Sequence, residues 1–273
     1  MNPLPVSKFT MPGNTAFTSF KENGFFTQEA VFTEVLVAQA NNAVVDVMNG
    51  IYETGIPPLY MVDVNCPRSI NRIGQIHYAN TSIRDLLCNP VIGKLVATLS
   101  GATSIRLWGS QLYYKPPNQS KNYQIGYHSD AQHFPGILSG GFTLWIPLTT
   151  TTPDSGTLRY IVGSHKIKQY IHLEGAQDPD VENQLRRLRA QLGEHQCQEF
   201  EVYLPTGGVS IHDQDTLHAS LCNMSDKPRV AIAASIVTDK TRYLTAADTF
   251  GILDIINDNS CSYEYKLDER LIK

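Results

Sequence analysis

The second half of this sequence consists of short runs rich in β-branched and aromatic residues, separated by clusters of Gly, Pro, Asn and Asp. Runs of this kind between turn signals are typical of strands. Many short strands in succession predict a sandwich or a barrel. The predicted strands are Ser104–Tyr114, Gly141–Leu148, Gly156–Val162, Glu199–Leu204, Gly208–His212 and Arg229–Val237.

Elsewhere the apolar residues are spaced as in helices. They recur at helical intervals from Thr27 to Asn49, where Asn49-Gly50 supplies a stop, so one long amphipathic helix is predicted there. Shorter helices are predicted at Ser82–Leu87, Pro90–Leu99 and Val181–Leu192.

The chain has 273 residues, and no linker or internal repeat separates two cores. Since β-sandwiches often reach about 200–250 residues as one domain, we expect a single domain over residues 1–273. Its expected parts are a mostly helical N-terminal part (about 20–100), a β-sandwich core (about 104–238) and a C-terminal extension (239–273).

Charge and composition exclude several classes of protein. The chain has 22 basic and 26 acidic residues, a net charge of −4, and lacks the basic stripe of a nucleic-acid-binding surface. It shows no apolar run that predicts a membrane helix and no secretory signal. Its five cysteines include no C-x-x-C pair, so neither a disulfide framework nor a cysteine zinc site is predicted. We expect a cytoplasmic protein; the sequence leaves its oligomeric state open.

Histidine spacing indicates a metal site. His128-Ser129-Asp130 is the one H-x-D triplet, and it follows a predicted strand. Residues two apart in a strand share a face, so the imidazole and the carboxylate can converge on one point. His218, from a distant run, is the candidate third ligand. Two histidines and one carboxylate make the facial triad of non-haem Fe(II) oxygenases, which leaves coordination positions open for a bidentate α-keto acid and for O2.

An α-keto acid co-substrate with a second carboxylate needs a cation in its pocket, because a buried anion must be paired. Arg229 is suited to this role, since its planar guanidinium can hold a carboxylate bidentately. It follows His218 by 229 − 218 = 11 residues and begins an apolar strand. By itself, an arginine at this place can equally be an ordinary surface residue.

Five blocks of the sequence resemble the phytanoyl-CoA dioxygenase family of Fe(II)/2-oxoglutarate-dependent oxygenases. They lie in the family's order, and the G-S-H-K motif and the His-to-Arg spacing are the most specific features. The blocks are Phe20–Phe26 (F-x-x-x-G-F-F), Gln111–Pro117 (Q-L-Y-Y-K-P-P), His128–Pro135 (H-S-D-A-Q-H-F-P), Trp145–Lys166 (ending G-S-H-K) and His218–Arg229 (H-x-S-x-x-N-x-S-x-x-x-R).

The resemblance implies a fold and a set of roles. The fold is a double-stranded β-helix, a jelly roll with flanking helices whose inner face carries the iron. His128, Asp130 and His218 match the iron ligands. Arg229 and Ser220 match the groups that hold the distal carboxylate of 2-oxoglutarate, and Gln111 and Trp145 match positions that line the co-substrate pocket.

The sequence departs from the family pattern at two places. Gly207-Gly208 stands where relatives usually have Gly-Asp, so a turn contact is expected to be lost, and Ala219 stands where Gly is common. Neither change touches a ligand. Because Asp130 is intact, while halogenating relatives replace it with a small residue, the resemblance implies an oxygenase rather than a halogenase.

Residues near the triad are candidates for contacting a substrate. They are Tyr113, Tyr127, Gln132, His133 and Phe134. His212 is a rival ligand, because it is followed by Asp213 and Asp215. The basic cluster Arg186, Arg187 and Arg189 is expected to be a solvated helix face, although it could also bind the phosphates of a coenzyme A ester. The weak basic signal favours a small or uncharged scaffold over such an ester.

The expected function is oxidation, by default hydroxylation, of a C–H bond of a small molecule, such as a natural-product or amino-acid-like scaffold. It would use Fe(II), 2-oxoglutarate and O2, and release succinate and CO2. Two alternatives remain open. A cupin-type metal enzyme without 2-oxoglutarate would have no use for Arg229, and a non-catalytic jelly roll would only bind a small molecule.

Overall fold

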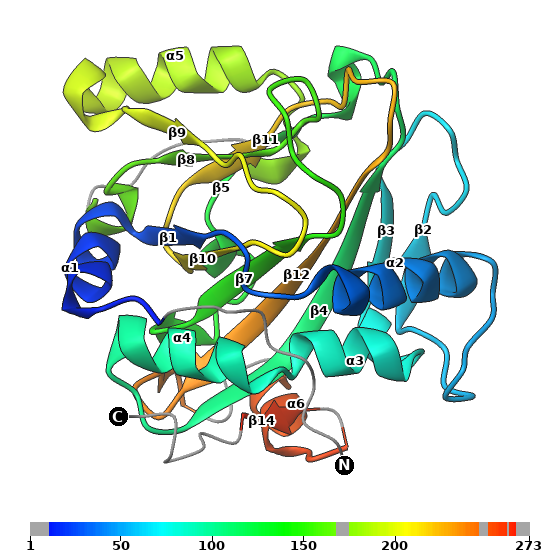
Figure 1. Cartoon of the computed structure of the whole chain (residues 1–273). Helices are drawn as coiled ribbons and strands as arrows, with labels where there is room; N and C mark the ends of the chain where they lie inside the picture. Colours follow the sequence, from blue (N-terminus) through cyan, green and yellow to red (C-terminus); the bar gives the residue numbers. More distant parts are fainter. Residues whose placement is uncertain (1–10, 168–174, 246–250, 261, 266–273) are drawn as a thin grey trace.

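Two facing antiparallel sheets form the centre of the computed structural model, which describes residues 11–167, 175–245, 251–260 and 262–265 (Figure 1). The larger sheet contains, in spatial order, β1 (Phe25–Gln28), β10 (Val209–Asp213), β7 (Phe142–Pro147), β12 (Arg229–Thr238), β4 (Ile105–Lys115), β3 (Asn71–Gly74) and β2 (Tyr60–Val62), with β14 (Tyr263–Glu264) beside β4. The smaller sheet contains β5 (Ile125–His128), β11 (His218–Ser220), β8 (Leu158–Ile161) and β9 (Glu199–Glu201). A separate pair joins β6 (Ile137–Ser139) to β13 (Arg242–Tyr243). This is the double-stranded β-helix that the family resemblance implied.

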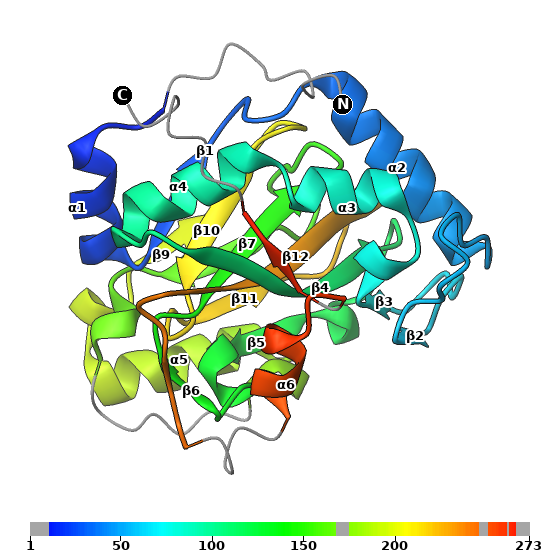
Figure 2. The same ribbon diagram turned by 90° about the horizontal axis from the view of Figure 1, so that it is seen from below.

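Helices cover the outer faces of both sheets (Figure 2). The larger sheet is covered by α1 (Asn14–Asn23), α2 (Glu34–Met48), α3 (Thr81–Leu87) and α4 (Pro90–Ser100). The smaller sheet packs against α5 (Val181–Leu192), and α6 (Ile252–Asn257) lies near β4. Short 3-10 turns connect these elements at Ile76–Tyr78, Lys121–Tyr123, Asp130–Gln132, Ser164–Lys166, Gly175–Gln177 and Glu194–Gln196. None of the helices in the described ranges combines the length and apolarity needed to cross a bilayer.

Alternation along the strands of the larger sheet divides its side chains between two environments. On β7, Phe142, Leu144 and Ile146 pack in the core under the helices. Thr143 and Trp145, one residue out of step, line the cavities between the two sheets. Successive side chains of a strand point to opposite faces. The outer face of the larger sheet therefore forms the main apolar core, and the polar side chains lie on its inner face.

A β-bulge changes this alternation within β4. Gly109 lies opposite Ser235, but the next residue of β12, Ile236, lies opposite Leu107, so Trp108 is an extra residue. The side chain of Gln75 closes the bulge: its Oε1 accepts from the Ser110 N–H (2.9 Å) and its Nε2 donates to the Trp108 carbonyl (3.3 Å). Beyond the bulge, the odd-numbered residues of β4 face the interior between the sheets.

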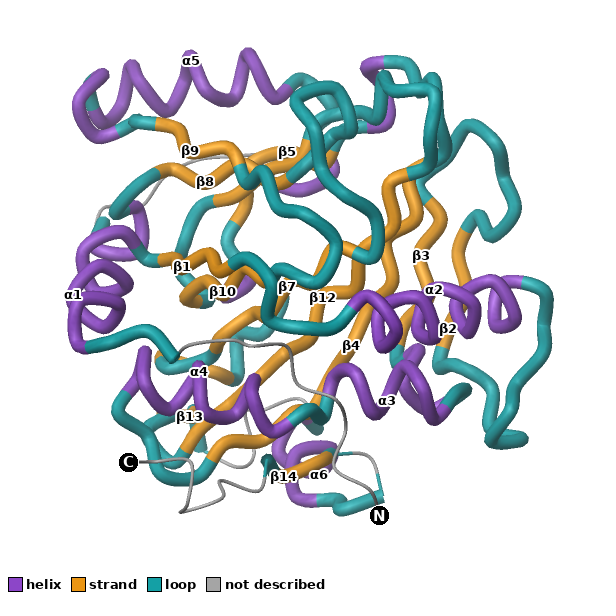
Figure 3. The backbone as a smooth tube through the Cα atoms, viewed as in Figure 1, coloured by secondary structure: helices purple, strands orange, loops and turns teal. Residues whose placement is uncertain are grey.

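Most predicted elements are confirmed. The six predicted strands correspond to β4, β7, β8, β9, β10 and β12, and the three short predicted helices correspond to α3, α4 and α5 (Figure 3). The N-terminal part, however, is less helical than expected, because it also contributes β1, β2 and β3 to the larger sheet. Of the expected C-terminal extension, residues 246–250, 261 and 266–273 lie outside the described ranges.

The predicted start of the long helix at Thr27 is wrong. Thr27 belongs to β1, and the helix begins at Glu34, where the Thr33 side chain accepts from the Leu36 N–H (3.4 Å). Between the strand and the helix, the N–H groups of Val31 and Phe32 both donate to the Gly207 carbonyl (2.8 and 2.9 Å). These bonds to a distant turn outweigh the local helical spacing.

Gly207 is therefore expected to be intolerant of a side chain. Its φ is +90°, and an added Cβ would lie 2.6 Å from the Phe32 carbonyl oxygen. We predict that Gly207→Ala lowers the free energy of unfolding by about 1–3 kcal/mol, measured by urea denaturation. Gly13→Ala is the control, because an added Cβ there meets nothing within 4 Å. Equal stability of the two variants would contradict this account of the turn.

Candidate metal centre and its two cavities

Strand pairing brings the three predicted ligands together. His218 at the start of β11 lies opposite His128 at the end of β5, and Asp130 begins the turn that follows β5. The Oδ1 atom of Asp130 lies 4.0 Å from Nε2 of His128 and 3.6 Å from Nε2 of His218. One ligand atom from each residue lies within 4.8 Å of the others. All three can therefore share one ion.

Backbone carbonyls orient both imidazoles. Nδ1 of His128 donates to the Gly126 carbonyl (2.8 Å), and Nδ1 of His218 donates to the Thr216 carbonyl (3.0 Å). The proton therefore sits on Nδ1 in each neutral ring, and the Nε2 lone pair is aimed at the shared point. Burial lowers the pKa of His128 and of His218, which favours the neutral form that binds metal. The donor set, one carboxylate oxygen and two neutral imidazoles, fits ferrous iron.

The other oxygen of Asp130 is held from the opposite sheet. The Thr143 hydroxyl on β7 donates to Oδ2, and Nε2 of His212 on β10 lies 3.1 Å from the same atom. Nδ1 of His212 accepts from the Tyr160 hydroxyl (3.0 Å). Burial raises the pKa of Asp130, but His218, His212 and His128 outweigh it, so the net pKa lies well below its usual value. The carboxylate therefore stays ionised, and its orientation is fixed.

The structure places His212 beside Asp130 and outside the three-residue cluster. It was a rival ligand on the sequence, but its Nε2 is directed at Asp130 from behind, outside the cluster of His128, Asp130 and His218. Partners that hold a ligating carboxylate in this way are a recurrent feature of metal sites. Asp130 is thus held by Thr143 and His212, and His212 in turn by Tyr160. The sequence pattern did not indicate these contacts.

Two cations are buried beside this cluster without a counter-ion. Arg229 is 2% exposed and Lys115 is 0% exposed, and they lie opposite each other on β12 and β4. Neither makes an ion pair with any residue in the described ranges, where the Arg229 Nε also lacks a hydrogen-bond partner. Burial lowers the pKa of Arg229 to about 10, and burial together with Arg229 lowers that of Lys115. A buried pair of this kind calls for an anion.

The Lys115 ammonium also fixes its neighbours. It donates to the Ser220 hydroxyl (2.7 Å), the Ser220 carbonyl (3.1 Å) and the Leu221 carbonyl. Nη2 of Arg229 donates to the Gly156 carbonyl (3.2 Å), and its guanidinium carbon lies 5.9 Å from the centre of the Trp145 ring. The predicted neighbours Ser220 and Trp145 thus line the same small cavity as Arg229. Lys115 belongs to the Q-L-Y-Y-K-P-P motif, but no role at the site was predicted for it.

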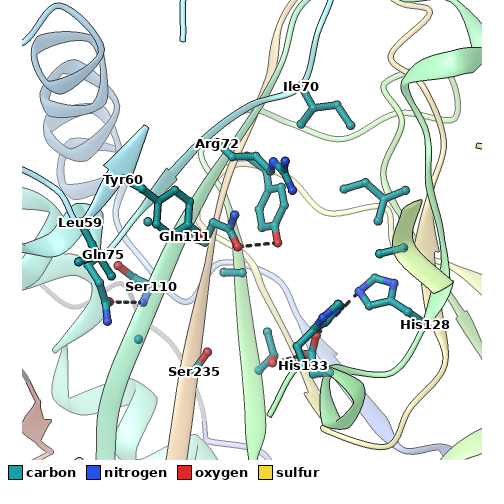
Figure 4. A pocket seen from close by; sticks show the side chains of 18 of the residues that line it. Leu59, Tyr60, Ile70, Arg72, Gln75, Ser110, Gln111, His128, His133 and Ser235 are labelled. Atoms are coloured by element: carbon teal, nitrogen blue, oxygen red, sulfur yellow. Dashed lines mark hydrogen bonds and ion pairs between the residues drawn. The ribbon is translucent and has the colours of Figure 1, made fainter. Parts of the chain in front are cut away.

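A larger cavity of about 680 Å³ opens on the other side of the cluster (Figure 4). Tyr113, His128 and Asp130 line both cavities, so the two spaces meet at the candidate metal centre. His133 and Phe134, predicted as substrate residues, line the larger cavity, as does Tyr113. Gln111 lines the larger cavity too, where its Oε1 accepts from the Tyr113 hydroxyl (2.9 Å), so the structure does not place it in the small co-substrate cavity.

Two predicted substrate residues lie elsewhere. Tyr127 is fully buried and its hydroxyl donates to Glu199 (2.6 Å), on the side of the smaller sheet that packs against α5. Its side chain lines neither cavity, because it falls on the opposite face of β5 from His128. Gln132 is exposed on the turn after Asp130 and lines neither cavity.

The basic cluster on α5 is largely neutralised. Arg187 pairs with Asp178 (3.0 Å), and Arg189 pairs with Glu194 (3.1 Å) and Glu199 (3.7 Å). These residues line neither cavity. Arg186 is exposed, whereas Arg187 and Arg189 are ion-paired and only partly exposed, so the cluster is not a fully solvated face, and the arrangement does not support a phosphate site.

Comparison with known proteins agrees with this geometry. The chain matches the sequence model of the phytanoyl-CoA dioxygenase (PhyH) family over residues 20–231. A curated relative from Stutzerimonas stutzeri, a probable alpha-ketoglutarate-dependent hypophosphite dioxygenase, is 26% identical over 156 residues, which cover 57% of this chain and 53% of the relative. The chain thus spans about half the length of that relative.

Solved structures show the same fold. The non-heme alpha ketoglutarate dependent carbocyclase SnoK from nogalamycin biosynthesis has a TM-score of 0.72 at 18% identity, covering 96% of this chain and 99% of SnoK. The epimerase SnoN, solved with Fe3+, alpha ketoglutarate and nogalamycin RO, has a TM-score of 0.64 at 18% identity, covering 84% of each chain. Fold and family model together place the chain among relatives that are named as alpha-ketoglutarate-dependent enzymes. Within that class, the chain belongs to the phytanoyl-CoA dioxygenase family.

The support of Asp130 by Thr143 can be tested directly. Thr143→Val keeps the shape of the side chain but removes the donor to Oδ2, so we predict an affinity for Fe(II) about 10–100-fold lower. An anaerobic titration against a competing chelator measures it. Thr103→Val is the matched control, because the Thr103 hydroxyl donates to an exposed carboxylate, Asp239 (2.9 Å), away from the site. Unchanged affinity in Thr143→Val would show that this hydroxyl does not support the ligand.

Proposed function

We propose that this chain catalyses the 2-oxoglutarate-dependent oxidation, by default the hydroxylation, of a C–H bond in a small molecule. The observation that carries the proposal is the buried Arg229, without an ion pair in the described ranges, in a cavity that also reaches His128, Asp130 and His218. Lys115 is buried opposite it on β4. A metal cluster alone suits many reactions. A cluster joined to a buried anion site suits a co-substrate that is both a chelator and a carboxylate.

The metal residues would act as a facial set. His128, Asp130 and His218 would hold Fe(II), which with 2-oxoglutarate and O2 supplies the oxidising power and leaves succinate and CO2. The carbonyls of Gly126 and Thr216 keep the Nε2 atoms pointed at the ion. Thr143 and His212 keep one oxygen of Asp130 occupied, so that the carboxylate binds through the other.

The co-substrate residues would bind and orient the distal carboxylate. Arg229 offers its free Nε edge, and Ser220 offers a hydroxyl held in place by Lys115. Trp145 closes the wall beside the guanidinium. A carboxylate here would neutralise charges that otherwise have no partner, and the low polarity of the site would strengthen the interaction.

The larger cavity would hold the substrate. Its volume, about 680 Å³, suits a small natural-product or amino-acid-like scaffold. The relatives named above differ: one is a probable hypophosphite dioxygenase, SnoK comes from nogalamycin biosynthesis, and SnoN was solved in complex with nogalamycin RO. Because Arg187 and Arg189 are already paired with carboxylates, the structure offers little support for a coenzyme A ester.

Arg229→Gln separates this proposal from its alternatives. Truncating one partner of a buried charged pair costs about 2–5 kcal/mol, so we predict that the KM for 2-oxoglutarate rises at least about thirtyfold. Succinate release measures it. Arg186→Gln, on the exposed face of α5, is the matched control and should leave the KM unchanged. A cupin-type enzyme that does not use 2-oxoglutarate would release no succinate from it, in the wild type or in either variant.

Asp130→Ala tests the metal assignment. We predict that it abolishes both succinate release and the visible charge-transfer absorption expected when Fe(II) and 2-oxoglutarate bind together under anaerobic conditions. The wild-type protein should show this absorption. Its absence from the wild type would favour the alternatives, a cupin-type enzyme without 2-oxoglutarate or a non-catalytic jelly roll. Full activity in Asp130→Ala would mean that another residue binds the metal.

A further inference from the structure

We propose that Arg72 recognises a carboxylate on the substrate, so that this enzyme acts on a carboxylic acid. The inference rests on the proposed function, because it assigns the larger cavity to the substrate. Arg72 lies on β3, opposite Tyr113 of β4. Its side chain points into the 680 Å³ cavity, and His128 and His133 lie on the other side of that space (Figure 4).

Within the described ranges, the guanidinium of Arg72 makes no ion pair and no hydrogen bond, although its side chain is partly buried. Asp63 also lines the cavity, but it is exposed and forms no ion pair with Arg72. Most surface arginines lie free in water. An unpaired arginine in the wall of a substrate cavity instead offers a planar fork of donors that matches a carboxylate.

Arg72 is distinct from the co-substrate site. Arg229 lines only the smaller cavity and Arg72 lines only the larger one, and the two cavities meet at His128 and Asp130. A dicarboxylate held by Arg229 and Ser220 therefore does not require Arg72. The two arginines would hold two different anions on opposite sides of the reacting centre.

Local charge favours a monoanion. The carboxylates of Asp63 and Asp130 also line this cavity, so a phosphate dianion would be under-neutralised by a single guanidinium. The Gln111 and Tyr113 side chains beside Arg72 are uncharged and hydrogen-bond each other (2.9 Å). Farther along, Trp108, Phe134 and Ile255 give an apolar wall. These features fit a substrate with a carboxylate at one end and an uncharged, partly apolar body.

Benzoate and its uncharged analogue benzamide are suitable probes. The full-length protein is saturated with 2-oxoglutarate and with Zn(II) in place of Fe(II), so that Arg229 is occupied and the sample is diamagnetic. Saturation-transfer NMR then gives the dissociation constants. A charge-assisted hydrogen bond contributes about 1.5–3 kcal/mol, so benzoate should bind at least about tenfold more tightly than benzamide. Arg72→Gln should bring that ratio to near one, Arg72→Lys should keep part of it, and Arg186→Gln should keep all of it.

Several outcomes would overturn the proposal: no benzoate binding, equal binding of benzoate and benzamide, a preference that survives in Arg72→Gln, or displacement of benzoate by further 2-oxoglutarate. The visible absorption of the same preparation with Fe(II) and 2-oxoglutarate is recorded in parallel. If that absorption is absent, the proposed function itself fails. If it is present and benzoate shows no dependence on Arg72, only the assignment of Arg72 fails.

Discussion

The antiparallel pairing of β11 with β5 is the contact on which the candidate site depends. It sets His218 opposite His128, although 90 positions separate them in the chain (218 − 128). The larger sheet then supplies what the smaller one lacks: β7 and β10 support the far oxygen of Asp130, and β4 and β12 supply the two cations. The site is thus an interface between sheets, with each sheet contributing a different chemical function.

Much of the fold could be predicted from local pattern. The strands rich in β-branched residues and the helices with clear caps, such as α4 between Asn89 and Gly101, are specified by neighbouring residues alone. The start of α2 could not be predicted in this way, because the residues before it bond to the carbonyl of Gly207 across the molecule. The distant turn at Gly207 determines where α2 begins, and the hydrophobic spacing of residues 27–33 does not indicate this contact.

The candidate site divides along the same line. The H-x-D triplet and the His-to-Arg spacing are short-range signals, and they indicated residues that the fold does bring together. Lys115, Thr143 and Tyr160 have no such signal, because a lysine, a threonine or a tyrosine in a strand is ordinary until its facing side is known. Tyr127 was misplaced for the converse reason: it adjoins His128 in sequence but falls on the opposite face of the strand.

The single extra residue at Trp108 determines the face of the larger sheet on which Lys115 lies. Upstream of it, Ile105 and Leu107 face the helices, and continued alternation would send Gln111, Tyr113 and Lys115 the same way, into hydrocarbon. The bulge reverses the face to which the odd-numbered residues of β4 point, so that the ammonium of Lys115 lies between the sheets. Deleting one residue there would therefore turn Lys115 away from Ser220 and direct its apolar neighbours Leu112 and Tyr114 between the sheets, although no residue of the anion site would itself be substituted.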